Sequence, residues 1–268
     1  TEDIKNPDVL YVGTETGLFV SLDRGNSWRR FKSNLPDVRV DEIAIHPRDN
    51  AMIVGTHGRA IFVLDNLAPV QELAAAQAAS RTATLFTPSP ALQWKTKDDR
   101  NDEFWGHQWF TGENPSNDAV LQFHVRGAAQ SMELRIIGAR NAEVRRLEVP
   151  ESKRAPGMQS VCWDLRVAPI PAAAPQGGQG GPGGGGFGGG ANRPRPIEGV
   201  RAPLPEVGFR PENPCAGGGG GGGGFGFGGN ANLGPYVAPG RYTVELVADG
   251  NVVDRKPITV VGDPGLTW

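Results

Sequence analysis

The chain has 268 residues and nearly equal numbers of basic and acidic side chains, 27 and 29, so its formal charge is only −2. This balance gives no electrostatic reason to expect a nucleic-acid partner or attachment to an anionic membrane surface. No apolar run approaches the roughly 20 residues that a membrane-spanning helix needs, so we expect no membrane span. The N-terminus has neither the basic nor the apolar segment of a signal peptide.

Residues 1–66 contain an internal repeat. Val12-Gly13-Thr14 matches Val54-Gly55-Thr56, and Leu22-Asp23 matches Leu64-Asp65, both at an offset of 42 residues. A period near 40 residues that is built from short strands is typical of the blades of a β-propeller. We therefore expect three strands in each copy, over residues 10–15, 18–22 and 28–32 and over residues 40–46, 52–56 and 60–64.

A turn motif lies between two strands of the first copy, where residues 21–28 read Ser-Leu-Asp-Arg-Gly-Asn-Ser-Trp. Asp23 can accept hydrogen bonds from the amides of the turn that follows it. Gly25 can adopt a positive φ without a Cβ clash, and Trp28 supplies a large apolar anchor for the next strand. The residues that we expect to build this turn are Ser21, Asp23, Gly25, Ser27 and Trp28.

This motif resembles the Asp-box, or bacterial neuraminidase repeat, of the β-propellers of sialidases, sortilin-like proteins and photosystem assembly factors. The resemblance implies a structural turn on the propeller rim, away from the axial site.

It also implies a partial propeller of about one and a half blades over residues 1–66. On this register the first copy lacks its inner strand and the second lacks its outer strand, so the chain is expected to begin inside a blade. One and a half blades leave a sheet edge and an apolar face open. We therefore expect a fragment of a longer polypeptide whose open faces a partner covers.

Residues 67–118 are expected to connect this region to the next. Residues 66–80 contain good helix formers, with Pro69 in the first turn, and predict a short helix. The rest of the segment is interpreted as irregular, apart from a possible strand at Leu85 and Phe86. Trp94, Trp105 and Trp109 are interpreted as filling the join between domains rather than as a platform for sugar stacking.

Residues 119–264 have the pattern of a β-sandwich, with short strands separated by turn residues. The expected strands cover residues 119–125, 132–137, 144–149, 160–165, 240–247 and 252–261. Trp163-Asp164-Leu165-Arg166 together with residues 239–244 resembles the Ig-like domain that follows propellers in large exported bacterial proteins of the glycosyl hydrolase type. The resemblance implies an all-β chain with an extracytoplasmic location.

A glycine-rich insertion at residues 168–234 departs from that pattern by its length. It holds most of the 39 glycines of the chain, and it buries too little apolar area to offset its chain entropy. A flexible spacer is therefore favoured over a docking surface. If the insertion does dock on a partner, the candidate anchors are Phe187, Phe225 and Phe227, because aromatic residues dominate interface energies.

The two cysteines, Cys162 and Cys215, leave an alternative open. Cys162 lies in a strand-like run and is expected to be a small buried residue. A disulfide between the two would form in an oxidising compartment, but the spacing alone does not decide the pairing. Neither cysteine has the partner spacing of a metal site.

Candidate catalytic residues are few. Glu42 and His46 lie on an expected inner strand near a propeller axis, and we interpret them as a solvated polar edge. The acidic run at residues 98–103 lacks the spacing of an EF-hand and is interpreted as a solvated loop. The four histidines, including His57 and His107, are dispersed. We therefore predict no catalytic residue, no metal site and no cofactor.

Two functional hypotheses follow. The first is a non-catalytic structural or interaction subunit that binds other protein subunits of an extracytoplasmic or membrane-bound assembly. By analogy with Asp-box assembly factors, a photosynthetic complex is a candidate host. The alternative is the C-terminal region of a glycoside hydrolase whose two catalytic carboxylates lie in blades outside this chain.

Overall fold

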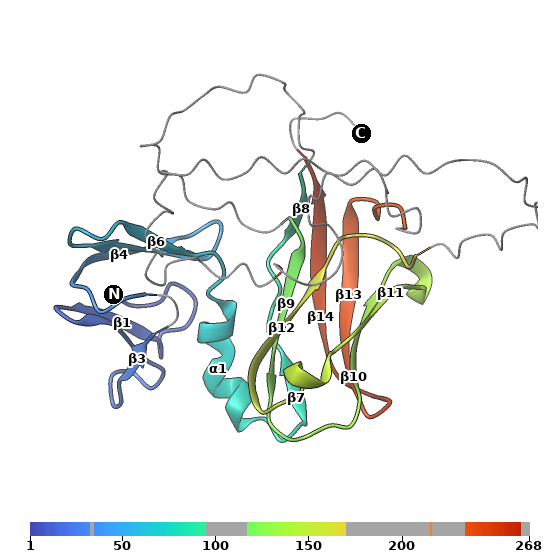
Figure 1. The fold of residues 1–268 in the computed structure, drawn as a ribbon, viewed down its shortest axis with the longest axis horizontal. Coiled ribbons are helices and arrows are strands. Elements are labelled where there is room, and N and C mark those ends of the chain that lie inside the picture. Colours follow the sequence, from blue (N-terminus) through green and yellow to red (C-terminus); the bar gives the residue numbers. More distant parts are fainter. Residues whose placement is uncertain (33–34, 95–116, 170–214, 216–233, 264–268) are drawn as a thin grey trace, which may run out of the picture.

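The computed structural model describes residues 1–32, 35–94, 117–169, 215 and 234–263. Strands dominate these residues, as expected for an all-β chain, and a single α-helix lies among them. Two groups of strands are visible in Figure 1, a smaller one that contains β1 to β6 and a larger one that contains β7 to β14. The helix α1 lies between the two groups.

The smaller group consists of two antiparallel three-stranded sheets. Their strands agree with the six that the repeat predicts. The first sheet contains β1 (Leu10–Thr14), β2 (Gly17–Ser21) and β3 (Arg29–Phe31). The second contains β4 (Val40–His46), β5 (Ala51–Thr56) and β6 (Ile61–Leu64).

These two sheets lie face to face around a common apolar core (Figure 1). Tyr11 and Leu18 project into it from the first sheet, and Met52 projects from the second. Each of these side chains is 1% exposed. Gly13 permits the close approach, because a Cβ added there would lie 2.7 Å from Cγ1 of Val40.

Residues 1–3 lie beside β1, at the edge of the first sheet, without forming a further strand of it. The amino group of Thr1 donates to the carbonyl of Tyr11 at 2.8 Å, and the amide of Tyr11 donates to the carbonyl of Thr1 at 2.8 Å. Glu2 forms an isolated antiparallel bridge with Leu10. In the second sheet, the chain enters α1 after β6 without forming an outer strand.

The helix α1 (Ala68–Ala78) has Pro69 in its first turn, as predicted. The side chain of Asn66 accepts a hydrogen bond from the amide of Ala68 at 3.1 Å and so satisfies one free donor at the helix start. Leu67, directly before the helix, is fully buried in the core of the two small sheets. The helix also contacts β7 and β9 of the larger group.

The larger group contains two sheets, a five-stranded one in the order β11-β10-β13-β14-β8 and a three-stranded one in the order β12-β9-β7. Both contribute side chains to one core, whose largest members are Trp163 and Phe123. The strands are β7 (Ala83–Leu85), β8 (Ala91–Gln93), β9 (Ala119–Val125), β10 (Met132–Ile137), β11 (Glu143–Glu148), β12 (Gly157–Trp163), β13 (Gly240–Ala248) and β14 (Asn251–Gly262). Two short 3₁₀ helices, Ala139–Asn141 and Glu151–Lys153, lie on either side of β11.

The segment expected to be irregular contributes two edge strands to these sheets. β7 contains Leu85, as predicted, and pairs with β9. β8 was not predicted, and it pairs in parallel with the end of β14. Trp94, which was expected to fill a join between domains, follows β8 directly and is 57% exposed. That expectation is wrong for Trp94, while Trp105 and Trp109 lie outside the described residues.

Candidate interaction site

The turn at residues 21–28 is built around the carboxylate of Asp23. Oδ1 accepts from the amide of Ser27 and from the hydroxyl of Ser21, each at 2.8 Å, and Oδ2 accepts from the hydroxyl of Ser27 at 2.5 Å. Hydrogen bonds from Ser27, and then the one from Ser21, stabilise the charged form and lower the pKa of Asp23 to about 2. The carboxylate is therefore occupied in holding the turn.

The backbone of the turn requires the left-handed region at two consecutive residues. Arg24 has φ of 59° and Gly25 has φ of 88°, and the amide of Gly25 donates to Oγ of Ser21 at 2.8 Å. Trp28 was expected to be a buried anchor, but it is 43% exposed. Its ring lies beside Gly25, where an added Cβ would come within 3.7 Å of it. Trp28 therefore covers the turn rather than the core.

A buried polar cluster joins the first sheet to α1, and sequence reasoning did not find it. Gln71 of α1 donates to both carboxylate oxygens of Asp3, at 2.9 and 3.0 Å. Its side chain also exchanges two hydrogen bonds with that of Asn50, at 2.9 and 3.0 Å. The hydroxyl of Tyr11 donates to Asp3 at 2.9 Å. Because buried polar groups are costly when unpaired, this cluster fixes the position of the helix on the sheets.

The same cluster excludes Tyr11 as a nucleophile. Burial and the neighbouring charge of Asp3 raise the pKa of the Tyr11 hydroxyl well above its ordinary value. The side chain is 1% exposed and donates its only proton to Asp3. It therefore stays neutral at physiological pH and serves the packing of the two sheets.

Within the described residues, the structure does not bring the candidate catalytic residues together into a site. Glu42 is exposed on β4, and His46, at the end of the same strand, pairs with Asp49 at 3.2 Å. His57 lies 3.3 Å from Asp41 on the surface, and His124 lies in β9 of the larger group. His107, the acidic run at 98–103, and the candidate anchors Phe187, Phe225 and Phe227 lie outside the described residues.

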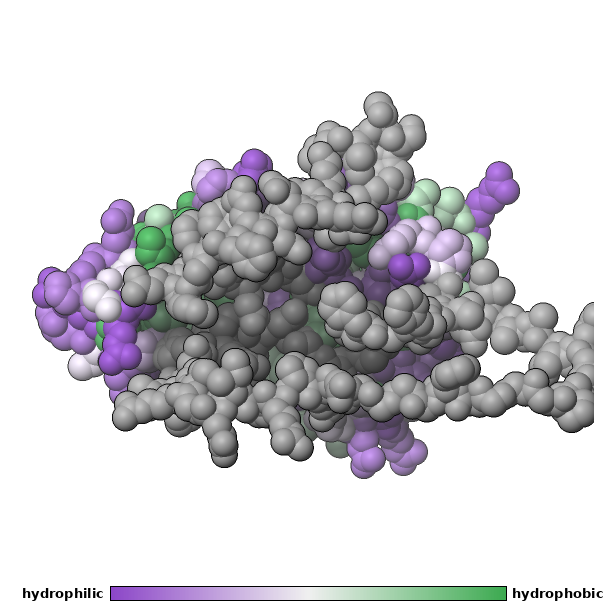
Figure 2. All heavy atoms as spheres, turned by 45° about the horizontal axis from the view of Figure 1, so that its top comes forward, coloured by the Kyte–Doolittle hydropathy of each residue, from purple (hydrophilic) through white to green (hydrophobic). Residues whose placement is uncertain are grey.

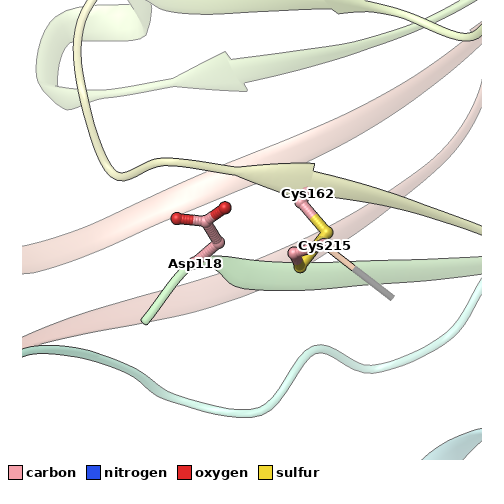
Figure 3. Close-up of side chains that lie close together, drawn as sticks. All are labelled: Asp118, Cys162 and Cys215. Atoms are coloured by element: carbon pink, nitrogen blue, oxygen red, sulfur yellow. A yellow bond between two sulfur atoms is a disulfide. The ribbon is translucent and has the colours of Figure 1, made fainter. Parts of the chain in front are cut away.

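The cysteine alternative is resolved in favour of a disulfide between Cys162 and Cys215, with a Cα–Cα distance of 5.6 Å. Figure 3 shows the bond beside Asp118, and the ligand atoms of the three residues lie within 4.8 Å of one another. Metal binding by cysteine requires thiolates, so the oxidised pair is not a metal site. Burial, and secondarily the charge of Asp164, raises the pKa of Asp118.

The two ends of the glycine-rich insertion meet in a narrow neck. Val167 donates to the carbonyl of Pro235 at 3.0 Å, and Val237 donates to that of Leu165 at 2.8 Å. The guanidinium of Arg166 lies 3.8 Å from the ring centroid of Tyr236 and bonds the carbonyl of Gly234 at 2.9 Å. The insertion is therefore attached to the larger group at its two ends, which meet in the neck, and at Cys215 through the disulfide.

Apolar side chains are exposed on the outer faces of the two small sheets. Ile61 and Val63 of β6 are 70% and 57% exposed, and Val12 of β1 is 40% exposed. Figure 2 shows apolar surface among polar side chains at the left of the molecule, where Figure 1 places these sheets. Exposed apolar surface that is contiguous marks interaction sites in soluble proteins.

Comparisons with protein-family models, with curated proteins and with solved structures found no match to this chain. Among the described residues, no helix has the length and apolarity that crossing a membrane requires.

Proposed function

We propose that this protein is a non-catalytic structural and interaction subunit of an extracytoplasmic protein assembly. The observation that carries the proposal is the outer face of the sheet β4-β5-β6, where Ile61 and Val63 are 70% and 57% exposed. Two apolar side chains on one edge strand favour burial against another protein, since their exposure gains nothing for the isolated chain.

The polar groups of the described residues support the same proposal. The carboxylates of Asp23 and Asp3 are each occupied by several donors of their own turn or cluster. A hydrolytic site instead requires a pair of carboxylates that face a substrate cleft. The carboxylates of Asp23 and Asp3 therefore stabilise the fold, as expected in a structural protein.

The proposal includes a finer assignment of the fold. The repeat of 42 residues and the stacking of the two small sheets favour consecutive blades of a partial β-propeller. The two sheets around Trp163 favour an Ig-like sandwich that carries the insertion. The disulfide between Cys162 and Cys215 supports an extracytoplasmic location, because such bonds persist in oxidising compartments.

Hydroxyl-radical footprinting tests this proposal on the native assembly. The labelling of Val63 is compared between the protein purified gently from its source and the isolated chain at high dilution. We expect strong protection in the native assembly. Val252 of β14, which is 38% exposed, serves as the matched control outside the two small sheets. Equal labelling of Val63 in both samples, or hydrolysis of aryl glycosides by the isolated chain, would contradict the proposal.

A further inference from the structure

The strand β6 lies at one edge of its sheet, and its register shows which backbone groups point to that edge. The amide of Thr56 donates to the carbonyl of Ala60 at 3.3 Å, at the start of the pairing between β5 and β6. Alternate residues of an antiparallel strand bond the same neighbour, so the backbone of Phe62 faces β5. The N–H and C=O groups of Ile61 and Val63 therefore point to the other side. Among the described residues, no strand pairs with β6 there.

This edge also differs in composition from the other edges of the two small sheets. β3 contains Arg29 and Arg30. β4 contains Asp41 and Glu42, and residues 1–3 lie beside β1. Charged side chains on an edge strand discourage pairing with a further strand. The sequence of β6 is Ile-Phe-Val-Leu, without a charged residue, so this edge has no such protection.

The first sheet shows what covers the equivalent edge. The offset of 42 residues aligns β2 with β6, so that Phe19 corresponds to Ile61 and Ser21 corresponds to Val63. β3 pairs antiparallel with β2 on that side. With β3 and the turn before it in place, Ser21 is 1% exposed, whereas Val63 is 57% exposed. After β6 the chain enters α1 instead, so the described part of the second sheet lacks the strand that covers the first.

We propose that an extended strand of another protein pairs antiparallel with β6 and completes this sheet. The backbone of that strand bonds the N–H and C=O groups of Ile61 and Val63, and its apolar side chains cover theirs. Strand addition of this kind combines backbone hydrogen bonds with contacts to alternate side chains. The inference rests on the proposed function and deepens it, because it names the form in which the partner binds this surface.

Hydrogen exchange resolved to single amides tests the inference on the isolated chain and on the native assembly. In the isolated chain we expect fast exchange at Ile61 and Val63 and slow exchange at Phe62, whose amide faces β5. In the assembly the exchange of Ile61 and Val63 should slow at least about tenfold, as an added hydrogen bond requires. Phe62 should change less and serves as the control within the same strand.

Two variants separate the backbone contact from the side-chain contact. Val63→Pro removes the N–H that points to the open edge, whereas Val63→Ala keeps it. Proline is tolerated in an edge strand where the missing N–H faces solvent, so both isolated variants should melt close to the wild type. In cells that produce the assembly, we expect at least about tenfold less Val63→Pro than Val63→Ala to be recovered in it. Equal recovery would overturn the inference. Should Val63→Pro fail to fold, the exchange experiment, which needs no variant, decides alone.

The exchange experiment also distinguishes failure of the inference from failure of the proposed function. If the side chain of Val63 is protected from labelling in the assembly while the amides of Ile61 and Val63 exchange as before, the inference falls and the proposed function stands. Slow exchange of these two amides already in the isolated chain would also overturn the inference, because the edge would then be occupied within the chain. If neither the side chain nor the amides change in the assembly, the proposed function itself is contradicted.

Discussion

The two groups of strands bury their apolar surface in different ways. The core of the larger group has 20 buried apolar residues, drawn from both of its sheets, whereas that of the smaller group has 10. On the surface of the larger group, arginines pair with carboxylates, as in the contact of Arg146 with Glu143 at 2.9 Å and of Arg255 with Glu245 at 2.7 Å, and some apolar side chains such as Met158 are exposed as well. The outer faces of the smaller group expose Val12, Ile61 and Val63 beside a core half as large.

This difference shows which group can fold without a partner. A two-sheet unit that buries one face of each sheet and solvates the other satisfies the requirements of an independent domain. The smaller group has a core of half that size and leaves Ile61 and Val63 of β6 more than half exposed. We therefore expect substitutions in the larger core to cost more free energy of unfolding than those in the smaller group.

Trp163 provides the largest expected effect. It is fully buried, packs edge-on against Tyr242 with ring centroids 5.8 Å apart, and donates to the carbonyl of Arg166 at 3.0 Å. Trp163→Ala should lower the free energy of unfolding of the larger group by about 3–5 kcal/mol. Trp28→Ala, in the smaller group, should cost only about 1 kcal/mol, since Trp28 is 43% exposed. Hydrogen exchange of β12 and β2, measured by mass spectrometry, would test both values, and equal losses would contradict the comparison.

The disulfide should have the next largest effect, again on the larger group. Cys162 and Cys215 are 53 residues apart in the sequence, so the cross-link restricts the unfolded chain. Replacing both residues by alanine should cost about 2–4 kcal/mol. Protection of β9 and β12 from hydrogen exchange should fall, and that of β1 and β5 should stay unchanged. A loss shared by both groups would mean that the two unfold as one unit.

Gln71 tests the attachment of α1 to the smaller group. Gln71→Ala removes the two hydrogen bonds that Nε2 of Gln71 donates to the carboxylate of Asp3, and it leaves the side chain of Asn50 without its partner. A buried polar group that loses its partner costs about 1–3 kcal/mol. The loss should show as faster hydrogen exchange in β1 and α1. Gln130→Ala, at an exposed amide, is the matched control and should have no measurable effect.

Much of this architecture follows from residue patterns. The repeat at Val12 and Val54 locates both small sheets, because alternating apolar residues and the turn at Asp23 are local signals. The apolar alternation of residues 119–125 likewise predicts β9, every second residue of which is buried. In these segments local propensity and burial agree, so the sequence is sufficient to predict the positions of the strands.

The features that the sequence did not predict depend on contacts between side chains or strands whose partners cannot be read from local sequence. β8 has three residues and pairs in parallel with Val260 and Val261, far along the chain. Gln71 lies in a helix rich in alanine and glutamine, where a buried amide has the same sequence pattern as an exposed one. Trp28 was expected to be buried, but its ring lies beside Gly25, over the turn. Local patterns carry no information on such partners.

The smallest expected effect concerns the response of the turn at residues 21–28 to acid. The folded pKa of Asp23 is about 2, against an ordinary value of 3.8, because the turn donates to its charged form. A group with a lowered pKa contributes stability above its unfolded pKa, and the contribution is lost as the pH falls through the folded value. The smaller group should therefore lose stability between about pH 4 and pH 2. Asp23→Asn keeps one acceptor oxygen and removes the titration, so its own loss over this range should be smaller than that of the wild type. Thermal melts of both proteins at pH 7 and pH 3 measure the difference, and the pH 7 melts report the cost of the substitution itself.

Parallel shifts of the melting temperature in the two proteins would mean that Asp23 does not contribute to acid sensitivity. A larger shift in β9 than in β2, followed by hydrogen exchange at pH 3, would reverse the comparison between the two groups.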